Sequence, residues 1–441
     1  MSKKILMFIA AVLLVGMSLP AFAAVENVKV GGDITIRGIY RTDYDFTKNS
    51  TQAQGARDNV DYLMTTTRIY VTSELTDNVA AVIRLINERD WDVEIAGSTN
   101  IDLDLAYIKL SDMFVPGLSA TLGRQEIILG EGFIIGDLNG FVSPAVFGGD
   151  LSARLSTDAL RFDYKLATVP LTLTGFVAKI IENYATVSPP PPAIGIDTGL
   201  DQDLYGINAN YQVPTAEAEV EGYFVSLNNA HATKNSANEL SVQTFGARVA
   251  HEVAATPGFS WKGEFAGQWG KTAGLNNKGY AGYISADYAF QNIPWEPKVG
   301  LTYYHFSGDN DATDNTDNDW NPLFPDAAGD RIGAIVDASG LGATGWGQQS
   351  NMQVIKLSVS IQPTEKISIS LDWFNDQLVK PAAGEKKELG NEIDLNLGYA
   401  YSEDVEFGLT FGYFVRGSAI KNAVADSADA MQIIGSVAVA F

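Results

Sequence analysis

The chain has 441 residues, a formal net charge of −23, 46% hydrophobic residues and no cysteine. The acidic balance disfavours a nucleic-acid-binding protein, which needs a basic surface to displace counterions from phosphate. The hydrophobic content is too high for a disordered acidic chain. The lack of cysteine excludes a disulfide scaffold, a thiolate nucleophile and a lipid anchor on an N-terminal cysteine.

The N-terminus has the features of a secretory signal peptide. Two lysines precede an apolar run over 5–19, and the small-x-small sequence Ala-Phe-Ala follows at 21–23. We therefore predict a cleaved signal peptide at 1–23 and an exported chain over 24–441. No later stretch approaches 18 uninterrupted apolar residues, so a membrane could be crossed only by strands.

After this leader, the sequence reads as one strand after another. Apolar and polar residues alternate, as in Ile34-Thr35-Ile36-Arg37, and helical periodicity is hard to find. Most of the segments are about 9–13 residues long, which is enough for a tilted strand to cross a bilayer. We expect about 18 strands, at 28–41, 59–76, 79–89, 101–111, 118–129, 158–166, 171–182, 204–212, 217–228, 240–252, 259–270, 279–289, 297–307, 352–362, 366–377, 388–401, 405–415 and 429–441.

The connections between these segments alternate strictly between short and long. The short ones are 77–78, 112–117, 167–170, 213–216, 253–258, 290–296, 363–365 and 402–404. Tight periplasmic turns and long extracellular loops alternate in this way in outer-membrane barrels, whereas a Greek-key sandwich would not sort its connections by parity. Strands cross hydrocarbon only in a closed sheet. We predict an all-β transmembrane antiparallel β-barrel of about 18 strands in the bacterial outer membrane.

The end of the chain supports a barrel. The last predicted strand alternates up to a terminal Phe441, which resembles the signal by which the barrel-assembly machinery recognises outer-membrane proteins. Eighteen strands enclose a lumen too wide for side chains alone to fill, so we expect a water-filled channel. The expected partners are outer-membrane lipid and a polar or anionic solute, with no nucleic acid.

Two long connections have unusual composition. The connection 130–157 carries the apolar run Phe133-Ile134-Ile135, so it either folds inward and narrows the pore or packs on the rim. The connection 308–351 has eight aspartates and one arginine, so it is either a solvated acidic loop or a calcium site. The spacing lacks an EF-hand pattern and favours the solvated loop.

Charged residues fall on the face of the strands opposite the apolar one. We expect them to line the pore and to select solutes by size and by charge pairing. Arg124 is ambiguous, because Leu122 shares its parity. The predicted pore-lining residues are Arg37, Arg68, Arg84, Arg124, Arg161, Arg248, Glu392 and Asp394.

Three segments in order resemble the alginate-export family of outer-membrane barrels. They are Gly123-Arg124-Gln125 with Gly130, Ser307-Gly308-Asp309 leading to Asn-Pro-Leu-Phe-Pro at 321–325, and Gly390-Asn391-Glu392-Ile393-Asp394-Leu395. The resemblance implies a monomeric barrel of 18 strands and an anionic saccharide such as alginate as the cargo. The mixed charges of the predicted lumen depart from the excess of positive charge expected for a polyuronate exporter.

The predicted function is a porin-like channel for passive passage of polar or charged solutes. One alternative is a structural or adhesive barrel that acts through its loops. A barrel hydrolase is the other alternative, with a nucleophile near His231, His251 or His305, although no Gly-x-Ser-x-Gly or His-Glu-x-x-His motif is present. We predict no catalytic residues, no cofactor and no metal site.

Overall fold

The computed structural model describes residues 27–48, 59–91, 101–138, 149–181, 184–186, 195–197, 201–229, 239–309, 311, 313–326, 331–339 and 348–441. The predicted signal peptide at 1–23 lies outside these residues, so its cleavage stays a prediction. In the part of the chain that is described, no helix is long and apolar enough to span a membrane.

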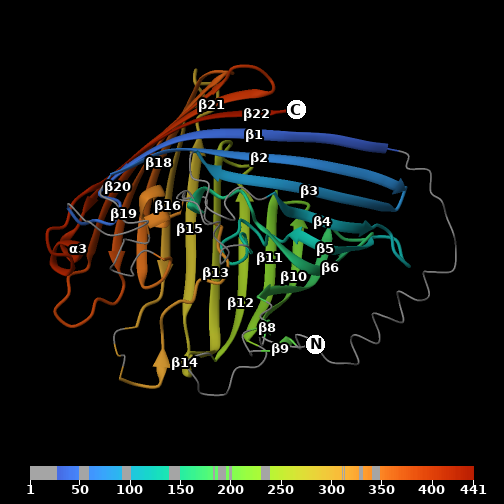
Figure 1. Ribbon diagram of the computed structural model, residues 1–441, viewed down its shortest axis with the longest axis horizontal. Coiled ribbons are helices and arrows are strands. Elements are labelled where there is room, and N and C mark those ends of the chain that lie inside the picture. Colours follow the sequence, from blue (N-terminus) through green and yellow to red (C-terminus); the bar gives the residue numbers. More distant parts are fainter. Residues whose placement is uncertain are drawn as a thin grey trace.

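Eighteen antiparallel strands form a closed ring, which confirms the predicted fold class (Figure 1). Each strand pairs with the ring strands before and after it, and the last pairs with the first. The ring strands are β1 (Asn27–Thr42), β2 (Asn59–Thr76), β3 (Val79–Asp90), β4 (Asp102–Leu110), β5 (Leu118–Glu126), β6 (Ser156–Lys165), β7 (Leu171–Ile181), β10 (Gln202–Val213), β11 (Ala218–Asn229), β12 (Leu240–Glu252), β13 (Phe259–Thr272), β15 (Tyr280–Ala289), β16 (Lys298–Phe306), β18 (Met352–Thr364), β19 (Ile367–Leu378), β20 (Glu388–Ala400), β21 (Val405–Arg416) and β22 (Ala430–Ala440).

The seam between β1 and β22 closes the ring. Its register runs from Asp33 opposite Ala440 to Thr42 opposite Met431. Beyond it, the backbones of Gly32 and Phe441 exchange two hydrogen bonds of 2.9 Å. Because every ring strand pairs with a neighbour on each side, the sheet closes on itself, as a sheet that crosses hydrocarbon must.

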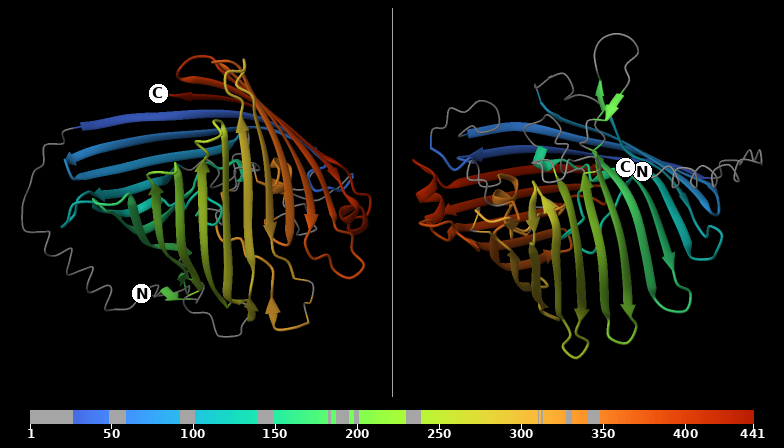
Figure 2. Two further views of the ribbon diagram at one scale, coloured as in Figure 1. Left: turned by 180° about the vertical axis from the view of Figure 1, so that it is seen from behind. Right: turned by 90° about the horizontal axis from the view of Figure 1, so that it is seen from below.

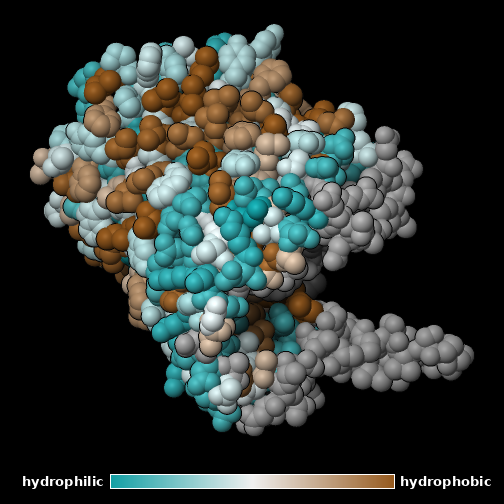
Figure 3. Space-filling view, turned by 90° about the vertical axis from the view of Figure 1, so that its left-hand side faces the viewer, coloured by the Kyte–Doolittle hydropathy of each residue, from teal (hydrophilic) through white to brown (hydrophobic). Residues whose placement is uncertain are grey.

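Side chains alternate between the outside and the lumen. On β3, Ile83 and Leu85 are 49% and 38% exposed on the outside, whereas Ile86 and Glu88 are 1% and 7% exposed on the inside. Seen from the left-hand side of Figure 1, hydrophobic residues form a band beside a hydrophilic region (Figure 3). The band is the surface expected to face lipid.

Short elements that the sequence pattern did not predict lie in the long connections. They are η2 (Gly149–Leu151), β8 (Tyr184–Thr186), β9 (Gly195–Asp197), β14 (Leu275–Asn277), β17 (Thr316–Asp317), α2 (Ala334–Ser339) and α3 (Ser418–Ala423). Of the ring strands that are shorter than predicted, β5 is shortened most, since it ends at Glu126 instead of residue 129. Ile127 and Leu129 instead turn inward, where they are 0% and 4% exposed.

Candidate pore and its constriction

Two long connections enter the ring and form a second layer inside it. We call them the first inner loop (127–155, described at 127–138 and 149–155) and the second inner loop (307–351, described at 307–309, 311, 313–326, 331–339 and 348–351). In Figures 1 and 2 parts of both loops, in teal and orange, lie within the ring of strands, whereas the segment of the second loop that carries β17 extends past the strand ends beside β14. Which residues line the pore therefore depends on this layer as well as on the strands.

The first half of the first inner loop packs against the lumen side of β13–β16. Glu131 forms an ion pair with Lys262 of β13 at 2.7 Å. The Phe133 ring meets Tyr283 of β15 edge-on and stacks on Phe306 of β16, with centroids 5.2 and 5.8 Å apart. Phe133 is 3% exposed, so apolar burial holds this half in place.

The second half of the same loop is attached across the ring, at β1 and β3. Arg41 of β1 forms an ion pair with Asp150 at 2.5 Å. The hydroxyl of Ser152 and the backbone amide of Ala153 each donate to the Glu88 carboxylate at 2.7 Å. Counted around the ring, β1–β3 lie opposite β12, β13 and β15, so the first inner loop spans the lumen instead of packing on the rim.

The second inner loop pairs with the first. The amide of Phe324 donates to the carbonyl of Ile134 at 3.1 Å, and the amide of Asp326 donates to that of Gly132 at 2.9 Å. The Arg331 guanidinium donates to the carbonyls of Glu131 and Asp326 at 2.6 and 2.5 Å. These contacts join the two loops into one inner layer with an apolar interior.

The second inner loop continues to the far wall, where α2 rests on two carboxylates of β20. The amides of Ile335 and Val336 donate to Glu392 at 2.6 and 3.2 Å, and the amide of Ala334 donates to Asp394 at 3.0 Å. Gly333 has φ +94°, and a Cβ there would collide with the Glu392 carboxylate. Glycine thus allows the backbone to approach the carboxylates.

Three of the predicted pore-lining residues face inward but are covered by the inner layer. Glu392 and Asp394 are 0% and 3% exposed beneath α2. Arg248 is 7% exposed and lies between Glu219 and Glu221, and a Cβ at Gly130 would come within 2.8 Å of its Nε. Glu392 and Asp394 hold the inner layer against the wall, and Arg248 joins two neighbouring strands of the wall.

The predicted arginines of β1–β6 stay more accessible. Arg68 pairs with Asp33 at 3.0 Å, and Arg161 pairs with Asp163 at 2.9 Å, with 30% and 32% of the two arginine side chains exposed. Arg84 pairs with Asp104 at 2.6 Å and with Glu126, which was not among the predicted pore-lining residues.

Arg37 differs from these neighbours. Its guanidinium donates to the Thr66 hydroxyl at 3.1 Å, and it forms no ion pair with any of the described residues. Arg37 is therefore the inward-facing arginine of this wall with the most capacity to bind an anion from outside the protein.

Arg124 departs from the prediction, because the register places it on the outer face. It lies opposite Ala106 and Asp158 and shares the face of Leu122 and Leu160. Its ion pair with Asp158, at 3.4 Å, is on that face. The resemblance to the family motif made Arg124 conspicuous, whereas strand parity had left its direction open.

Other parts of the described chain bear on the alternative chemistries. His251 packs edge-on against Trp261, and His305 stacks on Tyr280 at 5.5 Å, both on the outer face of the wall. His231 lies outside the described residues. Among the residues that are described, no group of three or more histidine, aspartate or glutamate side chains is arranged to hold a metal ion.

The inner layer was the least predictable part of the site. Glu131, Asp150 and Arg331 carry its polar contacts, and none of them was expected to have that role. The signal that could have found the layer is apolar: Phe133-Ile134-Ile135 in one loop and Leu323-Phe324 in the other, all now buried.

Comparison with known structures finds the same architecture. The crystal structure of Pseudomonas aeruginosa OccK3 (OpdO) matches with a TM-score of 0.56 and 12% identity, over 94% of this chain and 96% of that one. Acinetobacter baumannii OccAB2 matches with a TM-score of 0.57 and 9% identity, over 94% and 98%. At these identities the similarity concerns the fold alone.

No curated protein matches the sequence. The family model described as alginate export matches residues 28–433, from the first ring strand to the last. Together with the closed ring of strands, this match shows that the chain belongs to the alginate export family and is an outer-membrane channel.

Proposed function

We propose that solutes diffuse passively along the part of the β1–β6 wall that the inner layer leaves uncovered, and that Arg37 binds their anionic groups. The observation that carries the proposal is the Arg37 guanidinium, which faces inward and has no ion pair among the described residues. A guanidinium matches a carboxylate with two parallel hydrogen bonds, so this position favours carboxylated solutes over neutral ones.

The neighbouring ion pairs extend the same chemistry along the wall. Arg68 is held by a carboxylate of the adjacent strand, and Arg161 by a carboxylate of its own strand. A carboxylate on a solute can replace such a partner at little net cost, because partly exposed ion pairs contribute about 0–1 kcal/mol. Successive exchanges would let an anion move along the wall without being trapped.

The favoured cargo is an anionic saccharide such as a uronate oligomer. The family description supports a saccharide, and Arg37 supports an anion. Tyr70 and Tyr107 on the same inner wall offer aromatic faces and hydroxyls beside Arg84, which suit a hydroxylated ring. The direction of passage follows the concentration gradient in this mechanism.

The test is single-channel current of the refolded protein in a planar bilayer under a salt gradient, with and without oligouronate. Arg37→Gln should shift the reversal potential toward cation selectivity and weaken oligouronate block about tenfold. Arg124→Gln is the matched control, because it removes an arginine from the outer face. Equal selectivity and block in Arg37→Gln and wild type would overturn the role of Arg37. Conduction without block in wild type would reject the uronate cargo.

The same proposal extends to assembly. Phe441 is 65% exposed and lies at the seam, where an assembly partner could contact it before the ring closes. Phe441→Ala should lower the yield of folded barrel in cells while leaving refolding in detergent unchanged. Equal yields of the variant and the wild type in cells would contradict a role of the Phe441 side chain in recognition by the assembly partner.

A further inference from the structure

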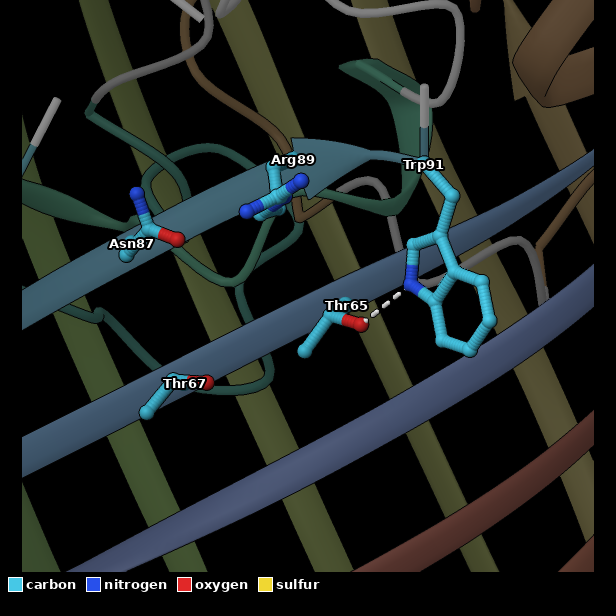
Figure 4. Close-up of a pocket in the computed structure, with 5 residues that line it drawn as sticks. All are labelled: Thr65, Thr67, Asn87, Arg89 and Trp91. Carbon is cyan, nitrogen blue, oxygen red and sulfur yellow. Dashed lines mark hydrogen bonds between the residues drawn. The ribbon is translucent and has the colours of Figure 1, made fainter. Parts of the chain in front are cut away.

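A polar pocket lies on the outer face of the barrel, where lipid-facing side chains are expected. It has a volume of about 470 Å³ and is lined by Thr65, Thr67, Asn87, Arg89 and Trp91. Figure 4 shows these five side chains on two adjacent strands. In the register of β2 and β3, Thr65 lies opposite Arg89 and Thr67 opposite Asn87.

The direction of these side chains follows from their neighbours. Met64, Thr66 and Glu88 alternate with them along β2 and β3 and are buried on the lumen side. On the outer face of the same strands, Ile69 and Leu85 are 47% and 38% exposed. The pocket therefore adjoins the apolar band and is separated from the pore by the wall.

The pocket lies near the extracellular ends of β2 and β3. The tight turn between β2 and β3 joins their periplasmic ends, so residues 65–67 and 87–91 lie toward the long-loop end. Trp91 is 45% exposed, and its indole N–H donates to the Thr65 hydroxyl at 2.7 Å. Tryptophan is enriched at the depth of lipid headgroups.

Arg89 supplies a positive charge with no protein partner among the described residues. Two other outer-face cations at this end are matched, since Arg124 pairs with Asp158 and Lys179 pairs with Asp203. Arg89 forms neither an ion pair nor a hydrogen bond with any residue that is described. A cation beside hydrocarbon is unfavourable unless an anion at the same depth compensates it.

We propose that this pocket binds the phosphate of an outer-leaflet glycolipid. The phosphate would accept hydrogen bonds from the Arg89 guanidinium and from the Thr65 and Thr67 hydroxyls. The acyl chains would lie along Ile69 and Leu85, and Trp91 would pack against the sugar. This site is distinct from the pore, so it does not rest on the proposed cargo.

The experiment is native mass spectrometry of the detergent-solubilised full chain titrated with bisphosphorylated lipid A. The expected result is a one-to-one complex whose affinity falls about tenfold in Arg89→Gln and is unchanged in Arg124→Gln. Fully dephosphorylated lipid A should bind the wild-type protein about tenfold more weakly, which tests the phosphate without any variant. Unchanged conductance in Arg89→Gln would show that its barrel is intact.

Three results would overturn the proposal. The first is equal affinity of Arg89→Gln and wild type for lipid A. The second is equal binding of dephosphorylated lipid A. The third is displacement of lipid A by equimolar phosphatidylglycerol or inorganic phosphate, which would assign the pocket to another anion.

Discussion

The β1–β6 and β18–β22 sectors of the ring follow the same alternation but use their charges differently. In the first sector, Arg68 and Arg161 are paired within the wall and remain about one-third exposed, while Arg41 and Glu88, at its extracellular end, are covered by the first inner loop. In the second, Glu392 and Asp394 also face inward, yet they are buried beneath the amides of α2. A side chain that faces the lumen therefore does not necessarily line the pore, because the inner layer covers some of these side chains and leaves others accessible.

The largest effect is expected when the inner layer is detached from the wall, because the covered side chains would then become accessible. Phe133→Ala should weaken its attachment by about 3–5 kcal/mol, because a large buried ring is replaced by a cavity. Single-channel recordings should then show a larger conductance and frequent switching between levels.

Phe162→Ala is the control for the ring truncation. Phe162 is 44% exposed on the outer face, so its loss should leave conductance unchanged. A wild-type conductance in Phe133→Ala would mean that the inner layer does not limit the current.

A smaller effect is expected when only the contact between α2 and Glu392 is weakened. Glu392→Gln keeps one acceptor for α2 but turns a second acceptor into a donor facing an amide, which costs about 1–3 kcal/mol. Hydrogen exchange of residues 334–339 in micelles should accelerate about tenfold or more. Asn396→Ala, on the same strand face and bonded to Ser370 and Thr410, should leave that exchange unchanged. Identical protection in both variants would contradict the role of Glu392 in holding α2 against the wall.

The smallest expected effect is a pH dependence of the second inner loop. Burial raises the pKa of Asp317 and Asp319 above the ordinary value of 3.8. The carboxyl groups of Asp317 and Asp319 therefore bind their protons more tightly in the folded loop than in the unfolded chain. Their stabilising contribution is complete below the ordinary pKa and falls as the pH rises through the raised values.

Hydrogen exchange of residues 313–320, corrected for intrinsic rates, should accordingly be slower at pH 4 than at pH 6. The double variant Asp317→Asn/Asp319→Asn should flatten this dependence. Asp311→Asn should not, because hydrogen bonds from Thr313 lower the pKa of Asp311 and act in the opposite direction. A pH dependence that survives the double variant would assign it to other groups.

The wall was predictable from the sequence, whereas the inner layer was only partly so. Strand alternation is a local property, so the eighteen ring strands and the inward direction of Arg37, Arg68 and Arg161 could be read directly. The burial of Glu392 depends on α2, which is 56 residues away in sequence. No local pattern encodes such a contact. The direction of Arg124 was ambiguous because this cation shares its strand face with apolar residues, which are expected to face lipid.

The seam of the ring has a consequence for how the molecule forms. Its first and last strands are about 400 residues apart, and their pairing is the contact that removes the final open edge. Chain entropy makes such a distant contact late, while the strands between are already able to pair. Until then, the growing sheet presents two unsatisfied edges that attract other chains. The time spent as an open sheet, rather than the stability of the finished ring, sets the risk of misassembly.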